Sequence, residues 1–595
     1  MTTKVSIEEE DGLLPMRAAP VCVVVGGHGA SGVRLLAPEE GEDVSIESSL
    51  DSSLESTTIT SSPAPSLRSA GSLDKGPQKR GFSKCLCWLF GIGISFFLIG
   101  SLAIIFPPFD VLMNERLRML RGFPAFEWWV EPPDEVFLRL YIFNITNKDE
   151  FLAGKQKLRV QEVGPWIFRE RLRHTDVYFN ENGTMTYTAH RSAEFLPELS
   201  GNLSMDTLLV LPNLGVLGVA SYMWDASFFA KLGINMMMMN YNSQPIVTMR
   251  AGDYMWNNTD PMFSMAGKIM PDLVPTTNLG ILHIIYEHFS DEVTVFTGLQ
   301  NSRRFFLIDK FRGSHRLGLW DGEYCDSVYG ASEGVSYPQF LTRNDSLLYL
   351  RKTICRATPL YYARDEMRYG MHGLRFELPS DLYASPDERS ENACFRRRGD
   401  FSPQLPSGAT DISPCFYNFP LAASFPHFMH ASPELKSNVE GLKPNPKKHG
   451  SYVIVEPTTG VPMESSARSQ SNLVVRPLHG FSKVQVFSNM TIPMFWAEYT
   501  QVGLPWYIRW LMYLVVEVIQ PTQQPVAYCL VTAGMSIILA VFFGWTCTRH
   551  HYQELSGANS TPRSRSYSSL NLLPSSKSSE ISFQPARKVD KLMHM

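Results

Sequence analysis

A serine flanked by glycines is the first group in this sequence that could do chemistry. Residues 330–334 read GASEG, the G-x-S-x-G pattern in which a serine hydroxyl can attack an acyl carbon. That chemistry needs a strand before the serine and a helix after it, so that the hydroxyl stands on a sharp turn. Here the polar stretch WDGEYCDSVY precedes the motif, and Pro338 blocks a helix behind it. We therefore expect a loop at Ser332, and no other catalytic constellation stands out, so an enzyme is not expected.

A glycine-rich motif near the N-terminus raises nucleotide binding as a second chemistry. Residues 27–32 read GHGASG, the G-x-G-x-x-G spacing that holds a pyrophosphate at the start of a helix. The stretch beyond it, LLAPEEGEDVSIESS, predicts neither that helix nor a second strand. The formal net charge of −4 also gives no basic stripe for a nucleic acid. We expect neither a cofactor nor a nucleic-acid partner.

Cysteines offer redox chemistry instead. Four of the nine cysteines lie in the long central segment, an even number that fits two disulfides in an oxidising compartment: Cys325, Cys355, Cys394 and Cys415. Four cysteines allow three pairings, and their spacing does not choose among them. No C-x-x-C pair indicates zinc, so no metal site is expected.

The elements that position these residues begin with two uncharged apolar stretches, residues 85–107 and 525–547. Each holds about 20 apolar positions, which is enough to cross a bilayer as a helix. Cys85, Cys87 and Cys547 stand at their ends, where S-palmitoylation occurs; free thiols packed in helices are the alternative. Basic residues before the first stretch and after the second place both chain ends in the cytosol, although three arginines after the first stretch oppose this.

Glycosylation motifs support the same orientation, because an Asn-X-Ser/Thr sequon is modified only in the secretory lumen. Six sequons lie between the two stretches: Asn144, Asn182, Asn202, Asn257, Asn344 and Asn489. Another, at Asn559, lies beyond the second stretch and should stay unmodified. The sequence therefore predicts a membrane hairpin, with residues 108–524 extracellular or lumenal.

Both tails, residues 1–84 and 548–595, are polar and serine-rich and should be disordered. They carry three short patterns that resemble endocytic sorting signals: Leu13 with Leu14, Tyr552 with Leu555, and Tyr567 with Leu570. Such signals are read by clathrin adaptors. We therefore expect cycling between the plasma membrane and endosomes, with lysosomes as a further candidate destination.

The central segment alternates short β-rich runs such as LRLYIFNIT and SYVIVEP with glycine, proline and asparagine turns, which is typical of antiparallel β structure. Residues 204–275 are instead Met-rich and helix-compatible. Aromatic residues close to both spans fit a belt at the lipid headgroups, with ordinary core packing as the alternative: Phe123, Phe126, Trp128, Trp129, Trp506, Tyr507, Trp510 and Tyr513.

A series of longer motifs resembles the class B scavenger receptor family. It includes VQEVGPWIFRE, VLPNLGVLG, CRATPLYY and SFPHFMHASPEL, in order along residues 85–548, but not the long N-terminal tail. The resemblance implies a two-span hairpin with a large α+β ectodomain, which has an antiparallel β-barrel core, an apical helical bundle and an internal hydrophobic tunnel. It also implies the disulfides Cys325–Cys394 and Cys355–Cys415.

The family resemblance makes the Met-rich region the apex, and we take its large apolar residues as ligand-binding candidates: Trp224, Phe228, Phe229, Met236, Met237, Met238, Met239, Met255 and Trp256. Methionines suit surfaces that accept varied apolar partners, although a plain helical core is the alternative. The closely spaced apical lysines of fatty-acid-translocase-like members are absent from this stretch.

The resemblance implies a receptor that binds lipoproteins or lipids at the apex and passes lipid to the membrane, internalises its cargo, or both. A covered route avoids exposing lipid CH₂ groups to water, at about 0.8 kcal/mol each. A sorting or adhesion receptor with a protein partner is the main alternative, and a two-span ion channel is a remote one. The sequence names no ligand, and a homo-oligomer is compatible with it.

Overall fold

The computed structural model describes residues 84–133, 136–269, 276–288, 291–395 and 405–557. These residues all belong to one compact unit. The sorting patterns at Leu13, Leu14, Tyr567 and Leu570 and the sequon at Asn559 lie outside the described residues.

In the sequence, one long apolar helix precedes the β-rich domain and another follows it. Helix α1 (Lys84–Ile105) closely matches the first predicted span. The second span belongs to a longer helical run made of α13 (Trp506–Tyr513), the π-helical turn η7 (Leu514–Ile519) and α14 (Gln520–Gly557). This run begins before residue 525 and continues into the segment predicted to be disordered. Both helices are long and apolar enough to cross a membrane.

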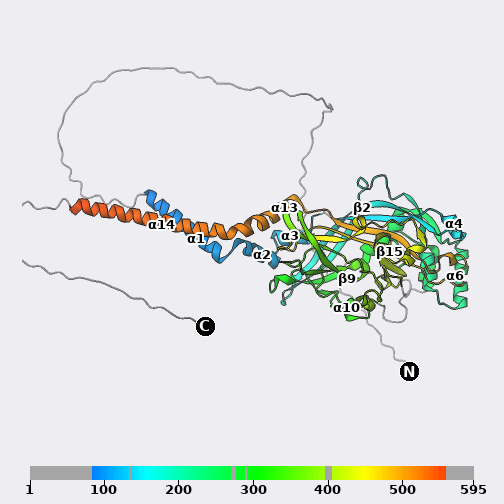
Figure 1. Cartoon of the computed structure of the whole chain (residues 1–595). Helices are drawn as coiled ribbons and strands as arrows, with labels where there is room; N and C mark the ends of the chain where they lie inside the picture. The colour runs from blue at the N-terminus through cyan, green and yellow to red at the C-terminus, as the bar shows by residue number, and fades with distance from the viewer. Residues whose placement is uncertain (1–83, 134–135, 270–275, 289–290, 396–404, 558–595) are drawn as a thin grey trace, which may run out of the picture. The chain divides into compact units, whose positions relative to one another are not determined.

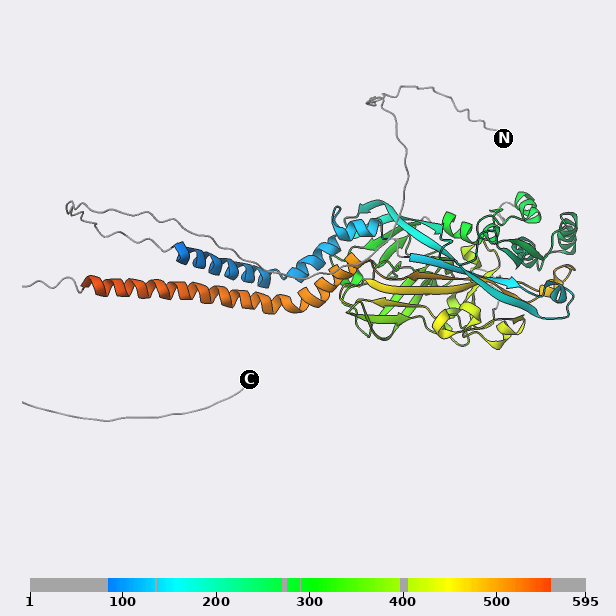
Figure 2. The ribbon, with the colours of Figure 1, turned by 90° about the horizontal axis from the view of Figure 1, so that it is seen from above.

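Glycines allow α1 and α14 to pack closely side by side (Figures 1 and 2). A Cβ on Gly100 would lie 2.8 Å from the Ala527 carbonyl oxygen, and one on Gly534 would lie 2.6 Å from the Phe97 nitrogen. The two backbones therefore touch where larger side chains would separate them, as is common between membrane helices.

The domain between the helices is built on a 14-stranded sheet. Its main path runs in the order β7 (Ile308–Phe311), β6 (Asp291–Phe296), β3 (Thr184–Phe195), β2 (Leu158–Phe179), β1 (Val136–Ile145), β16 (Thr491–Gln501), β15 (Pro462–Val474), β14 (Tyr452–Val455), β10 (Met371–Glu377), β9 (Arg356–Arg368) and β8 (Ser346–Arg351). Neighbours on this path are antiparallel. Strands β11 (Ala409–Asp411) and β12 (Leu421–Ser424) extend it beside β15, and β13 (Val439–Glu440) pairs in parallel with β2.

The pattern of side chains explains why these segments form strands. In β1, Leu138, Leu140 and Ile142 are buried and alternate with partly exposed residues, the period of two expected of a half-buried strand. Their buried face packs against large apolar side chains such as Trp166 and Trp496. The predicted antiparallel β domain is therefore present.

The expected barrel is not closed by strand pairing, because β7 and β8, at the ends of the path, do not pair with each other. The segment 330–332 lies between them. Ile308 N donates to Ala331 O at 2.7 Å on the β7 side, and Ser332 N donates to Leu348 O at 2.7 Å on the β8 side. The G-x-S-x-G motif is thus a loop that bridges the two edges of the sheet.

Helices gather at the end of the sheet opposite α13 (Figure 1). They are α5 (Leu214–Tyr222), α6 (Phe228–Asn240), α7 (Ala251–Trp256), α8 (Pro261–Ile269) and α9 (Ile281–His288), together with the ribbon of β4 (Leu208–Pro212) and β5 (Ile246–Arg250). Side chains cap two of them: Asn213 accepts from Val216 N at 3.2 Å, and Ser227 accepts from Ala230 N at 3.4 Å. The Met-rich region is helical as predicted, but it also contains strands.

Short helices complete the domain. Near the first span these are α2 (Pro108–Arg118) and α3 (Pro124–Val130); elsewhere they are α4 (Lys148–Leu152), α10 (Glu323–Asp326), α11 (Pro433–Ser437) and α12 (Pro446–His449). The aromatic belt prediction is wrong for Phe126 and Trp129, which are buried in a core cluster with Tyr187 and Phe306. Trp506 and Trp510 on α13 are exposed, so their place at the lipid headgroups stays a prediction.

Candidate functional site

Two adjoining cavities lie inside the domain. The first, of about 110 Å³, is lined mainly by apolar side chains of α5, α8, α9, β1 and β16. The second, of about 380 Å³, reaches α3 and the start of α13, where Trp128, Pro505 and Ile508 line it. Ile285, Thr353 and Tyr499 line both cavities. The cavities therefore meet at these residues, between the helical end of the domain and the helix that continues into the second span.

The wall of the second cavity carries buried charges in pairs. Glu170 binds Arg191 at 2.8 Å, and Lys352 binds Glu333 at 2.9 Å. Burial alone would raise the pKa of Glu333, but Lys352 and the hydroxyl of Tyr187 lower it to about 2. Glu333 is thus ionised, and each of the two carboxylates is paired with a cationic side chain, so the wall is polar but these charges are paired.

The structure divides the predicted apical residues into three groups. Phe228 and Phe229 are 73% and 80% exposed at the start of α6, and Met236 and Met239 are exposed further along the same helix. Met238 and Met255 are buried in the core, which supports the alternative of ordinary packing for these two. The remaining three are partly buried: Trp224, Met237 and Trp256.

The exposed members, with Leu232, form what we call the α6 face: Phe228, Phe229, Leu232, Met236 and Met239. An exposed apolar patch on one helix is typical of a surface that meets a protein or a lipid. The α6 face and the two cavities are therefore the features of this domain best suited to binding apolar ligands.

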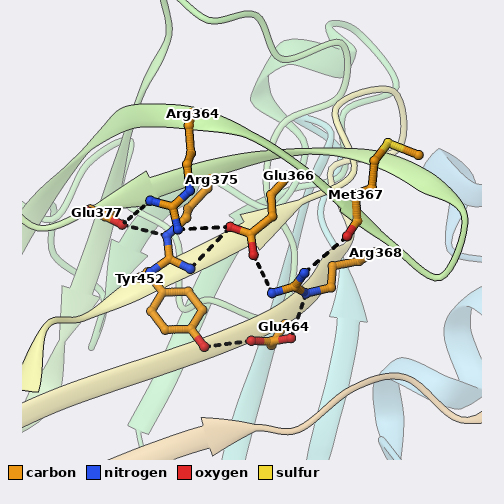
Figure 3. Close-up of polar contacts among 8 residues, drawn as sticks. All are labelled: Arg364, Glu366, Met367, Arg368, Arg375, Glu377, Tyr452 and Glu464. Atoms are coloured by element: carbon orange, nitrogen blue, oxygen red, sulfur yellow. Dashed lines mark hydrogen bonds and ion pairs between the residues drawn. The ribbon is translucent and has the colours of Figure 1, made fainter. Parts of the chain in front are cut away.

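A ladder of paired charges covers part of strands β9, β10 and β15, as Figure 3 shows. Arg368 binds Glu464 at 3.0 Å, and Arg375 binds Glu377 at 2.6 Å while its guanidinium stacks 3.7 Å from the ring centre of Tyr452. The third arginine of the ladder, Arg364, binds Glu366 and Glu377 at 3.3 and 3.4 Å. All three arginines shown are therefore paired, and the ladder is a poor site for a polyanion.

A buried cluster of Glu162, His427 and His449 is the one group with metal-ligand chemistry among the described residues. His427 Nε2 lies 2.6 Å from Glu162, and the two imidazoles are stacked with their centres 4.6 Å apart. The sequence analysis missed this cluster because its members lie far apart in the chain. They do fall within or beside the family-like motifs, which is the signal that could have drawn attention to them.

The protonation of these imidazoles argues against a metal. Nδ1 of His427 accepts from Lys443 N at 3.0 Å, and Nδ1 of His449 accepts from Asn445 N at 3.1 Å. A neutral imidazole that accepts at Nδ1 carries its proton on Nε2 and has no lone pair there for a cation. Burial lowers the pKa of His449 to about 4, so that ring is neutral at pH 7. We interpret the cluster as a structural hydrogen-bonded network.

Ser332 has no catalytic surroundings. It is buried, and its hydroxyl donates to Ser336 O at 2.7 Å and accepts from Gly334 N at 3.0 Å. No base contacts it among the described residues, and it follows a loop instead of a strand. Through these two hydrogen bonds to backbone atoms, the Ser332 hydroxyl stabilises the loop that bridges β7 and β8.

The remaining predicted residues are the disulfide cysteines, the candidates for palmitoylation and sorting, and the sequon asparagines. Disulfides join Cys325 with Cys394 and Cys355 with Cys415, the pairing that the resemblance implies. Cys85 and Cys87 on α1 and Cys547 on α14 are free and exposed, as is Tyr552 on α14 beside Leu555. Five sequon asparagines are exposed, namely Asn182, Asn202, Asn257, Asn344 and Asn489, whereas Asn144 is partly buried in β1.

Comparison with known proteins assigns most of the chain to one family. The model of the CD36 family matches residues 91–545, which include most of both apolar helices, the residues that line the cavities and the α6 face. The chain is also similar to curated proteins over most of the same region.

Scavenger receptor class B member 1 of Mus musculus is 30% identical over 414 residues, which cover 69% of this chain and 79% of that protein. The Bos taurus protein of the same name is 30% identical over 411 residues, with 68% and 79% covered. Lysosome membrane protein 2 of Homo sapiens is 27% identical over 392 residues, with 65% and 79% covered.

Proposed function

Because this chain belongs to the CD36 family, we propose that it is a membrane receptor that binds lipoproteins or other lipid ligands and passes lipid toward the bilayer. The observation that carries the proposal is the pair of adjoining cavities, one apolar and beside the helical end of the domain, the other reaching α13. Joined through Ile285, Thr353 and Tyr499, they would make a tunnel. A lipid inside it would keep its chains out of water.

The α6 face would be the docking surface for the donor particle. It lies at the end of the sheet away from α13, and its apolar side chains are exposed to solvent. In this arrangement residues 108–524 face outward, both termini are cytosolic, and the receptor reaches endosomes through adaptors that read its tails. None of these steps uses a catalytic residue or a cofactor.

The tunnel can be tested by blocking it after the protein has folded. In a full-length variant whose free cysteines are replaced by serine, Ile285→Cys would be labelled with a bulky maleimide in cells. We expect lipid uptake from lipoproteins to fall several-fold while particle binding is retained. The matched control is Ser346→Cys, an exposed position that lines neither cavity. Unchanged uptake after complete labelling at position 285 would contradict the tunnel.

A sorting receptor for a protein partner is the second candidate. The resemblance to lysosome membrane protein 2 favours it, because that relative's name places it in the lysosomal membrane. The same exposed α6 face would then bind a protein. This candidate would be favoured if the protein still bound and sorted its partner after the tunnel had been blocked at position 285, but no longer did so when the α6 face was changed.

A further inference from the structure

One wall of the first cavity is formed by α5 and by the loop of residues 413–420, which joins β11 to β12. Residues 416–420 of this loop all line the cavity. Tyr417 and Asn418 are at the same time exposed to solvent, as is Tyr222 at the end of α5. Because these residues border both the cavity and solvent, only one layer of residues separates the two at this wall.

The ring of Phe419 completes this wall by packing on a glycine. A Cβ atom on Gly218, inside α5, would overlap Cε2 and Cζ of the Phe419 ring. The same ring meets that of Phe263, on α8, edge to face with the ring centres 6.3 Å apart, and all three residues line the cavity. These contacts join apolar groups without a hydrogen bond. The ring can therefore move away and return without leaving a buried polar group unpaired.

The loop that carries Phe419 is anchored at both ends and unusual at its tip. The disulfide Cys355–Cys415 holds one end, and β12, which pairs with β15, holds the other. Between these anchors, Tyr417 and Asn418 have φ angles of 52° and 61°, a left-handed conformation that residues other than glycine rarely adopt. Asn418 N donates to Ser413 O at 2.9 Å, a hydrogen bond within the loop. Consecutive residues in this conformation are typical of segments that clamp ligands or switch between positions.

We propose that Phe419 is the gate of a lateral entrance to the first cavity, and that lipid chains enter and leave between α5 and the 413–420 loop when the ring moves away from Gly218. With the ring in place, the apolar lining is closed off from water on this side. Such a gate controls the rates of entry and release, because the ring must move for both. The proposal rests on the proposed lipid-binding function and names the route by which the ligand reaches that site.

The test is the rate at which lipid leaves the full-length glycoprotein in detergent. Radiolabelled oleate, cholesterol and cholesteryl oleate are the probes, and release is followed after adding an excess of the same unlabelled lipid. We expect Phe419→Ala to release bound lipid about tenfold faster. The equilibrium Kd should change much less, because entry becomes faster as well. The variant should fold, since Phe419 is a loop residue that is only partly buried.

Gly218→Ala tests the surface on which the ring packs. The added methyl group overlaps the ring of Phe419, so the ring must move and release should again be faster. The double variant Gly218→Ala/Phe419→Ala should release lipid no faster than Phe419→Ala alone, because it has no ring to displace. Gly233→Ala is the matched control. It makes the same change in α6, where a Cβ has no atom within 4 Å, and should release lipid like the unaltered protein.

An unchanged release rate in Phe419→Ala would overturn the gate and leave lipid binding in place. The gate would also be overturned if Gly218→Ala had the same effect with and without the Phe419 ring, because the methyl group would then act on the cavity itself. If the unaltered protein binds none of the three lipids, the proposed function itself fails.

Discussion

His449 makes the stability of this domain sensitive to acid. Burial lowers its pKa from 6.5 to about 4, with the nearby His427 and Lys448 acting in the same direction. Between pH 6.5 and 4 the unfolded chain therefore binds a proton at this residue that the folded protein does not, so stability falls as the pH falls through that window. His174, whose pKa burial also lowers to about 4, acts with the same sign.

We expect the melting temperature of the full-length protein to drop on going from pH 7.5 to pH 5. His449 can contribute on the order of 2 kcal/mol to this loss. His449→Asn should be less stable at pH 7.5 but should lose less on acidification, because it has no proton to take up. His479→Asn, at an exposed position, is the control. An equal drop in the unaltered protein and in His449→Asn would show that His449 does not titrate in this way.

Single residues also show where prediction from sequence reached its limit. The loop at Ser332 could be predicted because Pro338 and the polar stretch before it exclude a strand–turn–helix. The contacts of Glu170 with Arg191 and Tyr286 could not, because these partners lie 21 and 116 residues away in the chain and only the fold brings them to one carboxylate. Buried charge pairs leave no local pattern in a sequence.

At the scale of elements, α6 differs from a core helix in the residues it leaves exposed. Its period of apolar residues buries Ile234 and Met238 but also turns Phe229, Met236 and Met239 to solvent. A helix that is apolar all round normally lies in a core. The sequence therefore located the Met-rich helix. Which of its methionines are exposed to a partner depends on how the helix packs against its neighbours, and the sequence pattern does not show this.

We expect Phe229→Glu to weaken binding of lipoprotein particles to cells about tenfold or more, because an apolar side chain buried on docking contributes about 1.5–3 kcal/mol. Surface expression and the melting temperature should not change, since Phe229 is exposed. Phe340→Glu makes the same chemical change at an exposed aromatic residue outside α6 and should bind normally. Normal binding by Phe229→Glu, or equal loss in both variants, would exclude α6 as the docking surface.

The large elements were the most predictable part of the fold. The first span follows from an uncharged apolar run, and α1 covers nearly the same residues. The second differs because α13, η7 and α14 continue one another, so helical structure extends past the apolar run on both sides. The closed barrel expected from the family resemblance is not found as a strand ladder, because a loop instead of a strand joins β7 to β8.

For the whole molecule, the positions of glycans report the orientation in the membrane. If residues 108–524 face the lumen, the five exposed sequons should be modified and Asn559 should not. Asn144 should be the poorest acceptor, because it is partly buried in β1 and its side chain accepts from Val210 N at 2.8 Å. We expect Asn144→Gln to change the glycosidase-sensitive mass less than Asn344→Gln. Glycan on Asn559 and none on the other sites would reverse the proposed orientation.

The chain enters and leaves the β-rich domain at one point, where Phe109 N donates to the side chain of Gln523 at 3.0 Å across 414 residues of sequence. While α1 and α14 stay packed, the unfolded domain is a closed loop whose ends cannot drift apart. By the chain-entropy model used for disulfides, closing a loop of this length lowers the entropy of the unfolded state by the equivalent of about 6 kcal/mol. Proteolytic release of the domain from its two anchors would remove this constraint, so a shed domain would be less resistant to unfolding than the same domain on its membrane.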